Sequence, residues 1–150
     1  MTTRLRKSWV FDMDGTLSNS DHRKHHLLKE DKDWDAWYKD MDKDPVNEDV
    51  AQFTDVARKC GIPVTICTGR LVDYSDVTEK WLEDNEIYYD YLLMRPSGDF
   101  RDDTIVKAEM ICHMETLGLV PDIIWDDRDR VVKMWRDAGF TCFQVNYGDF

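Results

Sequence analysis

Five short apolar runs are spaced along the chain, and segments with helical periodicity separate most of them. The runs lie at residues 8–13, 63–68, 91–94, 123–125 and 142–145. Continuous apolar runs of this length are typical of parallel strands that are buried on both faces. Strands that alternate with helices predict right-handed crossovers and a central parallel sheet covered on both sides. We therefore expect an α/β fold with three layers, α/β/α.

The segments between these runs carry apolar residues three and four positions apart, which is typical of helices that bury one face. The expected helices lie at residues 50–60, 74–82, 106–117 and 131–138. Three of them are followed directly by glycine, the residue that most often ends a helix. These glycines are Gly61, Gly118 and Gly139.

The connection after the first expected strand, about residues 18–48, is longer than the connections usual in compact domains. An aromatic stripe at helical spacing runs through it, formed by Trp34, Trp37, Tyr38 and Met41. A helix that packs on the rest of the chain and a lid that faces the substrate explain this stripe equally well. We expect one domain, residues 1–150, with residues 18–48 as a small helical cap insertion.

Polar side chains follow three of the expected strands. They are Asp12 and Asp14, then Thr68, Gly69 and Arg70, and finally Asp126, Asp127 and Arg128. In open α/β sheets, ligands bind beyond the carboxyl ends of the strands. If the three strands are neighbours, four carboxylates converge there, and such a cluster repels itself unless it holds a cation. Ligand sets made only of oxygen select a hard ion, so the sequence predicts a Mg²⁺ site.

The spacing of Asp12 and Asp14 has a further consequence. Alternate residues at the end of a strand point the same way, so both carboxylates can reach one reacting group. Gly15 allows a sharp turn that brings backbone amides near an anion. Two solvent-exposed acids at a turn would explain this motif equally simply, so it indicates a reaction only together with other motifs.

Other motifs are present in a consistent order. Asp12-Met13-Asp14-Gly15-Thr16 after a hydrophobic strand resembles the first motif of the haloacid dehalogenase (HAD) superfamily of phosphatases. Thr68-Gly69-Arg70 looks like the second motif of this superfamily, Lys107 like the third, and Asp126-Asp127 like the fourth. The resemblance implies a HAD-like Rossmannoid domain that hydrolyses phosphate esters.

The resemblance also implies roles for individual residues. Asp12 would be the nucleophile that attacks phosphorus, and Asp14 the general acid and then the general base. Thr68 and Lys107 would hold the phosphoryl oxygens and offset developing charge. The implied Mg²⁺ ligands are Asp12, the backbone carbonyl of Asp14, and Asp127. Asp126 would be a further ligand, or would accept a hydrogen bond from a group that binds the ion.

A narrower resemblance covers nearly the whole chain and is weakest at residues 24–48. Residues 102–109, 124–136 and 148–150 look like the 3'-phosphatase domain of bacteriophage polynucleotide kinase/phosphatase. That family carries an arginine eleven residues after the nucleophile, where Arg23 stands, and Arg70 matches another. The residues implied to bind substrate are Arg23, Gly69, Arg70 and Arg128. Guanidinium groups bind phosphate bidentately, although a surface ion pair is the alternative explanation for Arg23 and Arg70.

The expected activity is the Mg²⁺-dependent removal of 3'-phosphates from nucleic-acid ends or nucleotides through an aspartyl-phosphate intermediate. A nucleotidase, or another phosphatase of small esters, is the alternative enzyme. A binding module that docks a separate kinase is the non-enzymatic alternative, and a separate kinase or ligase is also the expected partner of the enzyme. The sequence contains no G-x-x-x-x-G-K-[ST] motif, so kinase activity by that mechanism is not expected.

The formal net charge of -11 restricts the partners of the chain. Broad binding of duplex DNA depends on many Lys and Arg side chains, so the charge argues against it. One phosphorylated end is still compatible, because clustered arginines and a metal invert the field locally. No apolar run approaches the length of a membrane span, and the basic start leads into a strand, so we expect no membrane association and a cytoplasmic location.

Overall fold

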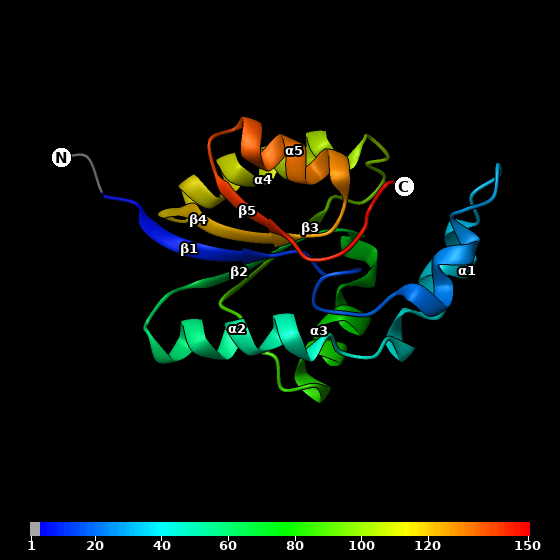
Figure 1. The fold of residues 1–150 in the computed structure, drawn as a ribbon, viewed down its shortest axis with the longest axis horizontal. Coiled ribbons are helices and arrows are strands. Elements are labelled where there is room, and N and C mark those ends of the chain that lie inside the picture. The colour runs from blue at the N-terminus through cyan, green and yellow to red at the C-terminus, as the bar shows by residue number, and fades with distance from the viewer. Residues whose placement is uncertain (1–3) are drawn as a thin grey trace.

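The computed structural model describes residues 4–150 and contains a five-stranded sheet in which all neighbouring strands are parallel. The order across the sheet is β3-β2-β1-β4-β5 (Figure 1). The strands are β1 (Arg6–Phe11), β2 (Val64–Leu71), β3 (Tyr91–Arg95), β4 (Leu119–Asp126) and β5 (Thr141–Gln144). Each predicted apolar run lies in or overlaps one of them, so the expected parallel sheet is confirmed.

Helices cover both faces of the sheet, as a chain of crossover connections requires (Figure 1). Those on one face are α2 (Glu48–Lys59) and α3 (Ser75–Asp84), the latter preceded by the short 3₁₀ helix η3 (Val72–Tyr74). Those on the other face are α4 (Asp103–Thr116) and α5 (Asp129–Asp137). The predicted α/β/α three-layer fold is confirmed. Within residues 4–150, no helix combines the length and apolar character needed to cross a membrane.

Two hydrophobic cores lie on opposite faces of the sheet, because successive side chains of a strand point to opposite sides. Val10 packs in the core under α4 and α5, whereas its neighbour Phe11 packs in the core under α2. Cys67 and Ile66 of β2 divide in the same way. Strands that supply both cores are anchored on two sides, and this fixes where their carboxyl ends lie.

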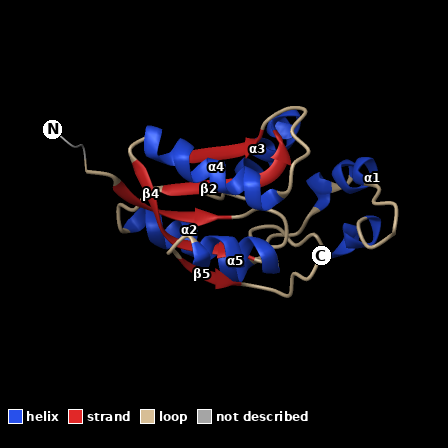
Figure 2. Ribbon diagram, turned by 90° about the horizontal axis from the view of Figure 1, so that it is seen from above, coloured by secondary structure: helices blue, strands red, loops and turns tan. Residues whose placement is uncertain are grey.

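Residues 18–48, which we call the insertion, leave after β1 and return just before α2. They form the 3₁₀ helix η1 (Asp21–His26), the short helix α1 (Trp34–Lys39) and the 3₁₀ helix η2 (Met41–Lys43). Hydrogen bonds hold the two ends together: the amide of Asn19 donates to Pro45 O at 2.7 Å, and the amide of Asn47 to Leu17 O at 2.9 Å. Figures 1 and 2 show α1 standing to one side of the sheet and its covering helices.

The aromatic stripe of the insertion is not one continuous helix. Trp34, Trp37 and Tyr38 lie on α1, but that helix ends at Lys39, and Met41 begins η2. Trp37 and Met41 are buried, whereas Trp34 remains 44 % exposed. The stripe therefore contains both packing residues and one partly exposed aromatic side chain, so packing alone does not account for all of it.

Candidate active site

The carboxyl ends of β2, β1 and β4 lie side by side, because these strands are neighbours in the sheet. Asp12 follows β1 directly, Arg70 lies near the end of β2, and Asp126 closes β4. The condition under which the sequence predicted a cluster of carboxylates is therefore met.

Asp12 lies at the floor of this cluster and is only 6 % exposed. Its Oδ1 accepts a hydrogen bond from Lys107 Nζ at 2.8 Å, and its Oδ2 accepts one from Thr16 Oγ1 at 3.0 Å. Lys107 comes from α4 and also donates to Asp126 Oδ2 at 2.9 Å. Burial works against the charge of Lys107, but attraction to Asp12 and Asp126 raises its pKa well above the usual value. The ammonium group thus stays charged and joins two carboxylates.

One lysine does not neutralise the cluster. Ligand oxygens of Asp12, Asp126 and Asp127 all lie within 4.8 Å of one another, and all three residues are buried. Burial, reinforced by repulsion from Asp126, raises the pKa of Asp12 to about 7. Burial and the charges of Asp12 and Asp126 raise the pKa of Asp127 to about 9. Three carboxylates at this distance favour the binding of positive charge.

The donor chemistry fits a hard divalent cation. Among residues 4–150, Asp127 Oδ2 is a buried atom without a hydrogen-bond partner, and a bound cation would satisfy it. Gly15 adopts a φ of +85°, and a Cβ at this position would overlap the Asp127 carboxylate. Glycine is therefore needed here both for the turn and for the space that the carboxylate occupies.

Asp14 has a different environment, because two arginines hold its carboxylate. Arg70 Nη2 donates to Asp14 Oδ1 at 2.7 Å, and Arg23 Nη2 forms a second, short hydrogen bond to the same oxygen. Burial opposes the charge of Asp14, but Arg70 and Arg23 outweigh it and hold the pKa of this carboxyl well below its usual range. Both arginines are buried, so they are not the surface ion pairs of the alternative explanation.

Arg23 is itself held in place by Asp44, a residue that the sequence analysis missed. Arg23 Nε and Nη2 donate to the two carboxylate oxygens of Asp44 at 2.8 and 2.5 Å. The ring of Trp37 lies 4.0 Å from the guanidinium carbon, and His22 Nε2 lies 2.7 Å from Asp44 Oδ1. Asp44 and Arg23 are 21 residues apart in an irregular insertion, so no local pattern indicated this pair.

A partly buried acid, Asp103 at the start of α4, holds two further arginines of the site. It accepts a hydrogen bond from Arg128 Nη1 at 2.5 Å and forms a short ion pair with Arg95. Arg95 Nε in turn donates to Gly69 O at 2.9 Å, and Arg128 Nε donates to Phe150 O at 2.6 Å. Asp103 and Arg95 were not predicted. Asp103 stands four residues before Lys107, one helical turn away, and this spacing was the only available signal.

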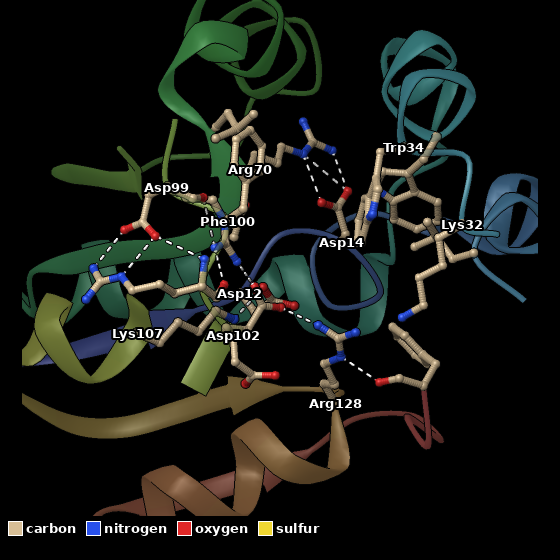
Figure 3. A pocket seen from close by; sticks show the side chains of 18 of the residues that line it. Asp12, Asp14, Lys32, Trp34, Arg70, Asp99, Phe100, Asp102, Lys107 and Arg128 are labelled. Atoms are coloured by element: carbon tan, nitrogen blue, oxygen red, sulfur yellow. Dashed lines mark hydrogen bonds and ion pairs between the residues drawn. The ribbon is translucent and has the colours of Figure 1, made fainter. Parts of the chain in front are cut away.

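These groups line one cavity of about 320 Å³ at the carboxyl edge of the sheet (Figure 3). Eight of the ten predicted site residues line it, namely Asp12, Asp14, Gly69, Arg70, Lys107, Asp126, Asp127 and Arg128. The other two, Arg23 and Thr68, do not line it and lie fully buried. Arg23 acts on the cavity through Asp14, and Thr68 Oγ1 accepts a hydrogen bond from the amide of Arg70 at 3.1 Å.

Comparisons with known proteins identify related chains. Residues 6–150 match the family described as the polynucleotide kinase PNKP phosphatase domain. A chain in a solved structure of a Pnkp1/Rnl/Hen1 complex is 36 % identical, with a TM-score of 0.84 over 97 % of this chain. A chain from the Pnkp1/Rnl/Hen1 RNA repair complex is 37 % identical, with a TM-score of 0.82 over 97 % of this chain. This protein spans only 47 % and 44 % of those two chains.

More distant structures share the fold alone. A class C acid phosphatase from Bacillus anthracis, solved with tungstate bound, is 14 % identical, with a TM-score of 0.68, and the match covers 98 % of this chain and 70 % of that one. The match to the phosphatase-domain family instead extends over nearly all residues described, including every carboxylate of the cluster. The chain therefore belongs to the family of polynucleotide kinase PNKP phosphatase domains, within the HAD superfamily of phosphatases.

Proposed function

We propose that this protein is a Mg²⁺-dependent polynucleotide 3'-phosphatase that removes phosphate through an intermediate on Asp12. The observation that carries the proposal is the arrangement of the cavity in a member of this family. A lysine-paired carboxylate, Asp12, lies at its floor and belongs to a cluster of three acids that one lysine does not neutralise. A second carboxylate, Asp14, lies between two buried arginines in the same cavity. These groups are what phosphoryl transfer to a carboxylate requires.

The residues that would hold the metal are Asp12, Asp126 and Asp127, with the backbone carbonyl of Asp14 as a further ligand. HAD phosphatases generally use Mg²⁺, and the carboxylate donors suit it. A bound Mg²⁺ would supply positive charge beside Asp12, so that an anionic phosphate can approach an anionic carboxylate. Lys107 supplies the same kind of charge through its contacts with Asp12 and Asp126.

In the first step, an Asp12 oxygen attacks phosphorus and forms an acyl phosphate. The bond between phosphorus and the 3' oxygen breaks, and Asp14 gives its proton to that oxygen. In the second step, Asp14 takes a proton from water, which attacks phosphorus. The bond to Asp12 breaks, inorganic phosphate leaves, and Asp12 is again a free carboxylate. Asp14 then releases the proton to solvent and returns to the ionised state of the free protein.

Asp14 must carry a proton to act in the first step, although its two arginines hold it ionised in the free protein. A phosphate dianion offers the same guanidinium groups more charge and more acceptor oxygens than a carboxylate does. We propose that substrate binding draws Arg70, which lines the cavity, toward the phosphate and thereby raises the pKa of Asp14, which then takes up a proton from solvent. Asp44 keeps Arg23 oriented during this exchange through its own two hydrogen bonds.

We further propose that the insertion, residues 18–48, acts as a small cap within one phosphatase domain. It supplies the aromatic residues Trp34, Trp37 and Tyr38 to the lining of the cavity, and the rest of the lining comes largely from the ends of the strands and the loops that follow them. Figure 3 shows Trp34 on the side of the insertion. Such a cap leaves room for the end of a polymer. The substrate is therefore a 3'-phosphorylated nucleic-acid end or nucleotide, and a kinase or ligase is the expected partner, as in the Pnkp1/Rnl/Hen1 RNA repair complex.

The proposed metal site predicts a pH-dependent stability. Because the pKa values of Asp12 and Asp127 are raised, the metal-free folded state holds protons that the unfolded state has lost. The melting temperature should therefore fall as the pH rises through about 7 and toward about 9. The expected scale is on the order of 2–4 °C per kcal/mol of lost stability.

Mg²⁺ binds the ionised carboxylates, so it should raise the melting temperature more at the higher pH. Asp127→Asn should flatten the pH dependence of the metal-free protein and remove most of the Mg²⁺ effect. Thermal melts of both proteins, in EDTA and in Mg²⁺, provide the measurement. An equal Mg²⁺ response in wild type and Asp127→Asn would contradict the assignment of Asp127 as a ligand.

The substrate assignment is tested by phosphate release from one oligonucleotide that carries phosphate at its 3' end or at its 5' end. We expect release from the 3' end, strong preference over the 5' end, and complete loss in EDTA. Comparison of RNA and DNA strands, and of nucleoside 3'-monophosphates, then defines the class of substrate. Release from both ends at equal rates, or from mononucleotides alone, would replace the proposal with a general phosphatase or a nucleotidase.

A further inference from the structure

Two exposed aromatic side chains stand in the wall of the active-site cavity. Trp34 belongs to α1 of the insertion and is 44 % exposed, and Phe100 belongs to the loop between β3 and α4 and is 84 % exposed. Both line the cavity that contains Asp12 and Lys107. Figure 3 shows Trp34 on the side of the insertion and Phe100 on the side of Asp99. Large aromatic faces left in water beside a reaction centre indicate a site for a planar ligand.

The neighbouring aromatic residues of the insertion are already engaged. Trp37 is buried and covers the guanidinium group of Arg23. Tyr38 stacks on Tyr74, with ring centroids 4.3 Å apart. Trp34 is therefore the indole of α1 that remains partly exposed in the cavity wall, and the position of α1 is fixed by the packing of the other two rings.

The charged residues around the cavity are mostly neutralised. Arg101 makes ion pairs with Asp99 at 2.8 Å and with Glu109 at 2.6 Å, and Arg130 pairs with Asp102 at 3.0 Å. A surface that follows a nucleic-acid backbone instead leaves its cations available for phosphates. Lys32, an exposed residue of the insertion, also lines the cavity, and its Nζ lies 5.9 Å from the ring centroid of Trp34. Apart from the phosphate site and this lysine, the uncommitted recognition surfaces are therefore the aromatic ones.

We propose that Trp34 and Phe100 form the binding site for the base of the nucleotide that carries the 3'-phosphate. The inference rests on the proposed function, because it assumes that a nucleotide occupies the cavity. The base stacks on these rings while its phosphate lies at Asp12. Stacking accepts any base, since every base has a π face, and it anchors the end of a strand without many backbone contacts. Trp34 and Phe100 are therefore substrate-binding residues that determine the preference for nucleotides.

The test compares three substrates with Trp34→Ala and Phe100→Ala. They are an oligonucleotide with a 3'-phosphate on a normal terminal nucleotide, the same strand ending in an abasic 3'-phosphorylated residue, and glycerol 2-phosphate. On the first substrate, each variant should lose about 5- to 150-fold in kcat/KM, mainly through KM, which is the scale of one lost base stack. On the other two substrates, both variants should match the wild type. Trp34→Phe should retain most of the wild-type activity.

Leu28→Ala and Tyr147→Ala are matched controls. Leu28 is an exposed side chain of the same insertion, at 71 %, and Tyr147 is an exposed aromatic residue, at 91 %, and neither lines the cavity. Both controls should behave as wild type on all substrates. Equal losses of the Trp34 and Phe100 variants on the abasic strand would overturn the base site and assign these residues to packing. A wild type that does not distinguish the normal from the abasic strand would overturn it as well.

The proposed function fails in a different way. In that case the wild type releases phosphate from glycerol 2-phosphate but from neither strand, and the base site is then rejected together with the polynucleotide assignment.

Discussion

Asp12→Asn should abolish phosphate release from every ester tested, with a loss of at least about 10⁴-fold in kcat, because the covalent intermediate can no longer form. The substitution keeps the size of the side chain and a carbonyl oxygen that can accept the hydrogen bond from Lys107. Steady-state phosphate release, with thermal melts as a control for folding, gives the measurement.

A direct test of the intermediate uses substrate labelled at phosphorus and quenched rapidly in acid. Label should remain on wild-type protein and be absent from Asp12→Asn. Turnover by Asp12→Asn within a few fold of wild type would assign the nucleophile to another residue or to water.

Asp14→Asn should lose about 100-fold or more in kcat with a 3'-phosphorylated nucleotide, because the leaving alkoxide then receives no proton. The outcome should depend on the leaving group. With 4-nitrophenyl phosphate, whose leaving group needs no proton, the first step should survive and the second should remain slow. Labelled acyl phosphate should therefore accumulate on Asp14→Asn and not on Asp12→Asn.

Stopped-flow release of nitrophenolate would show this accumulation as a rapid burst followed by slow turnover. If Asp14→Asn slowed the first step equally for nitrophenyl phosphate and for the 3'-phosphorylated nucleotide, a role of Asp14 in proton transfer would be contradicted. That result would instead indicate that Asp14 mainly organises Arg23 and Arg70, whose guanidinium groups it contacts in the free protein.

The sequence predicts the parts of the fold that depend on local patterns. Apolar runs identify all five strands, and the residue after or at the end of a run, such as Asp12 or Asp126, then falls at the ligand-binding edge. The convergence of these acids follows from the strand order, which the sequence analysis left as a condition and which the structure shows.

The partners of the arginines were beyond prediction from the sequence. Asp44, which orients Arg23, lies in an irregular segment. Asp103 begins α4, whereas the two arginines that it orients, Arg95 and Arg128, lie at the end of β3 and just after β4. An acidic chain offers many carboxylates to every arginine, so composition cannot select among them. The division of the aromatic stripe into buried Trp37 and open Trp34 also depends on where α1 ends, which helical spacing alone does not fix.

The bridge that Asp14 makes between two arginines has a consequence for the end of the catalytic cycle. In the free protein, the guanidinium groups of Arg23 and Arg70 are already paired with the carboxylate of Asp14. In the proposed cycle, Asp14 becomes ionised again after the second step and can take the place of inorganic phosphate beside Arg70. Under this proposal, the residue that helps to cleave the ester also helps to expel the product, and the arginines of the site are kept from being saturated by the phosphate that the enzyme generates.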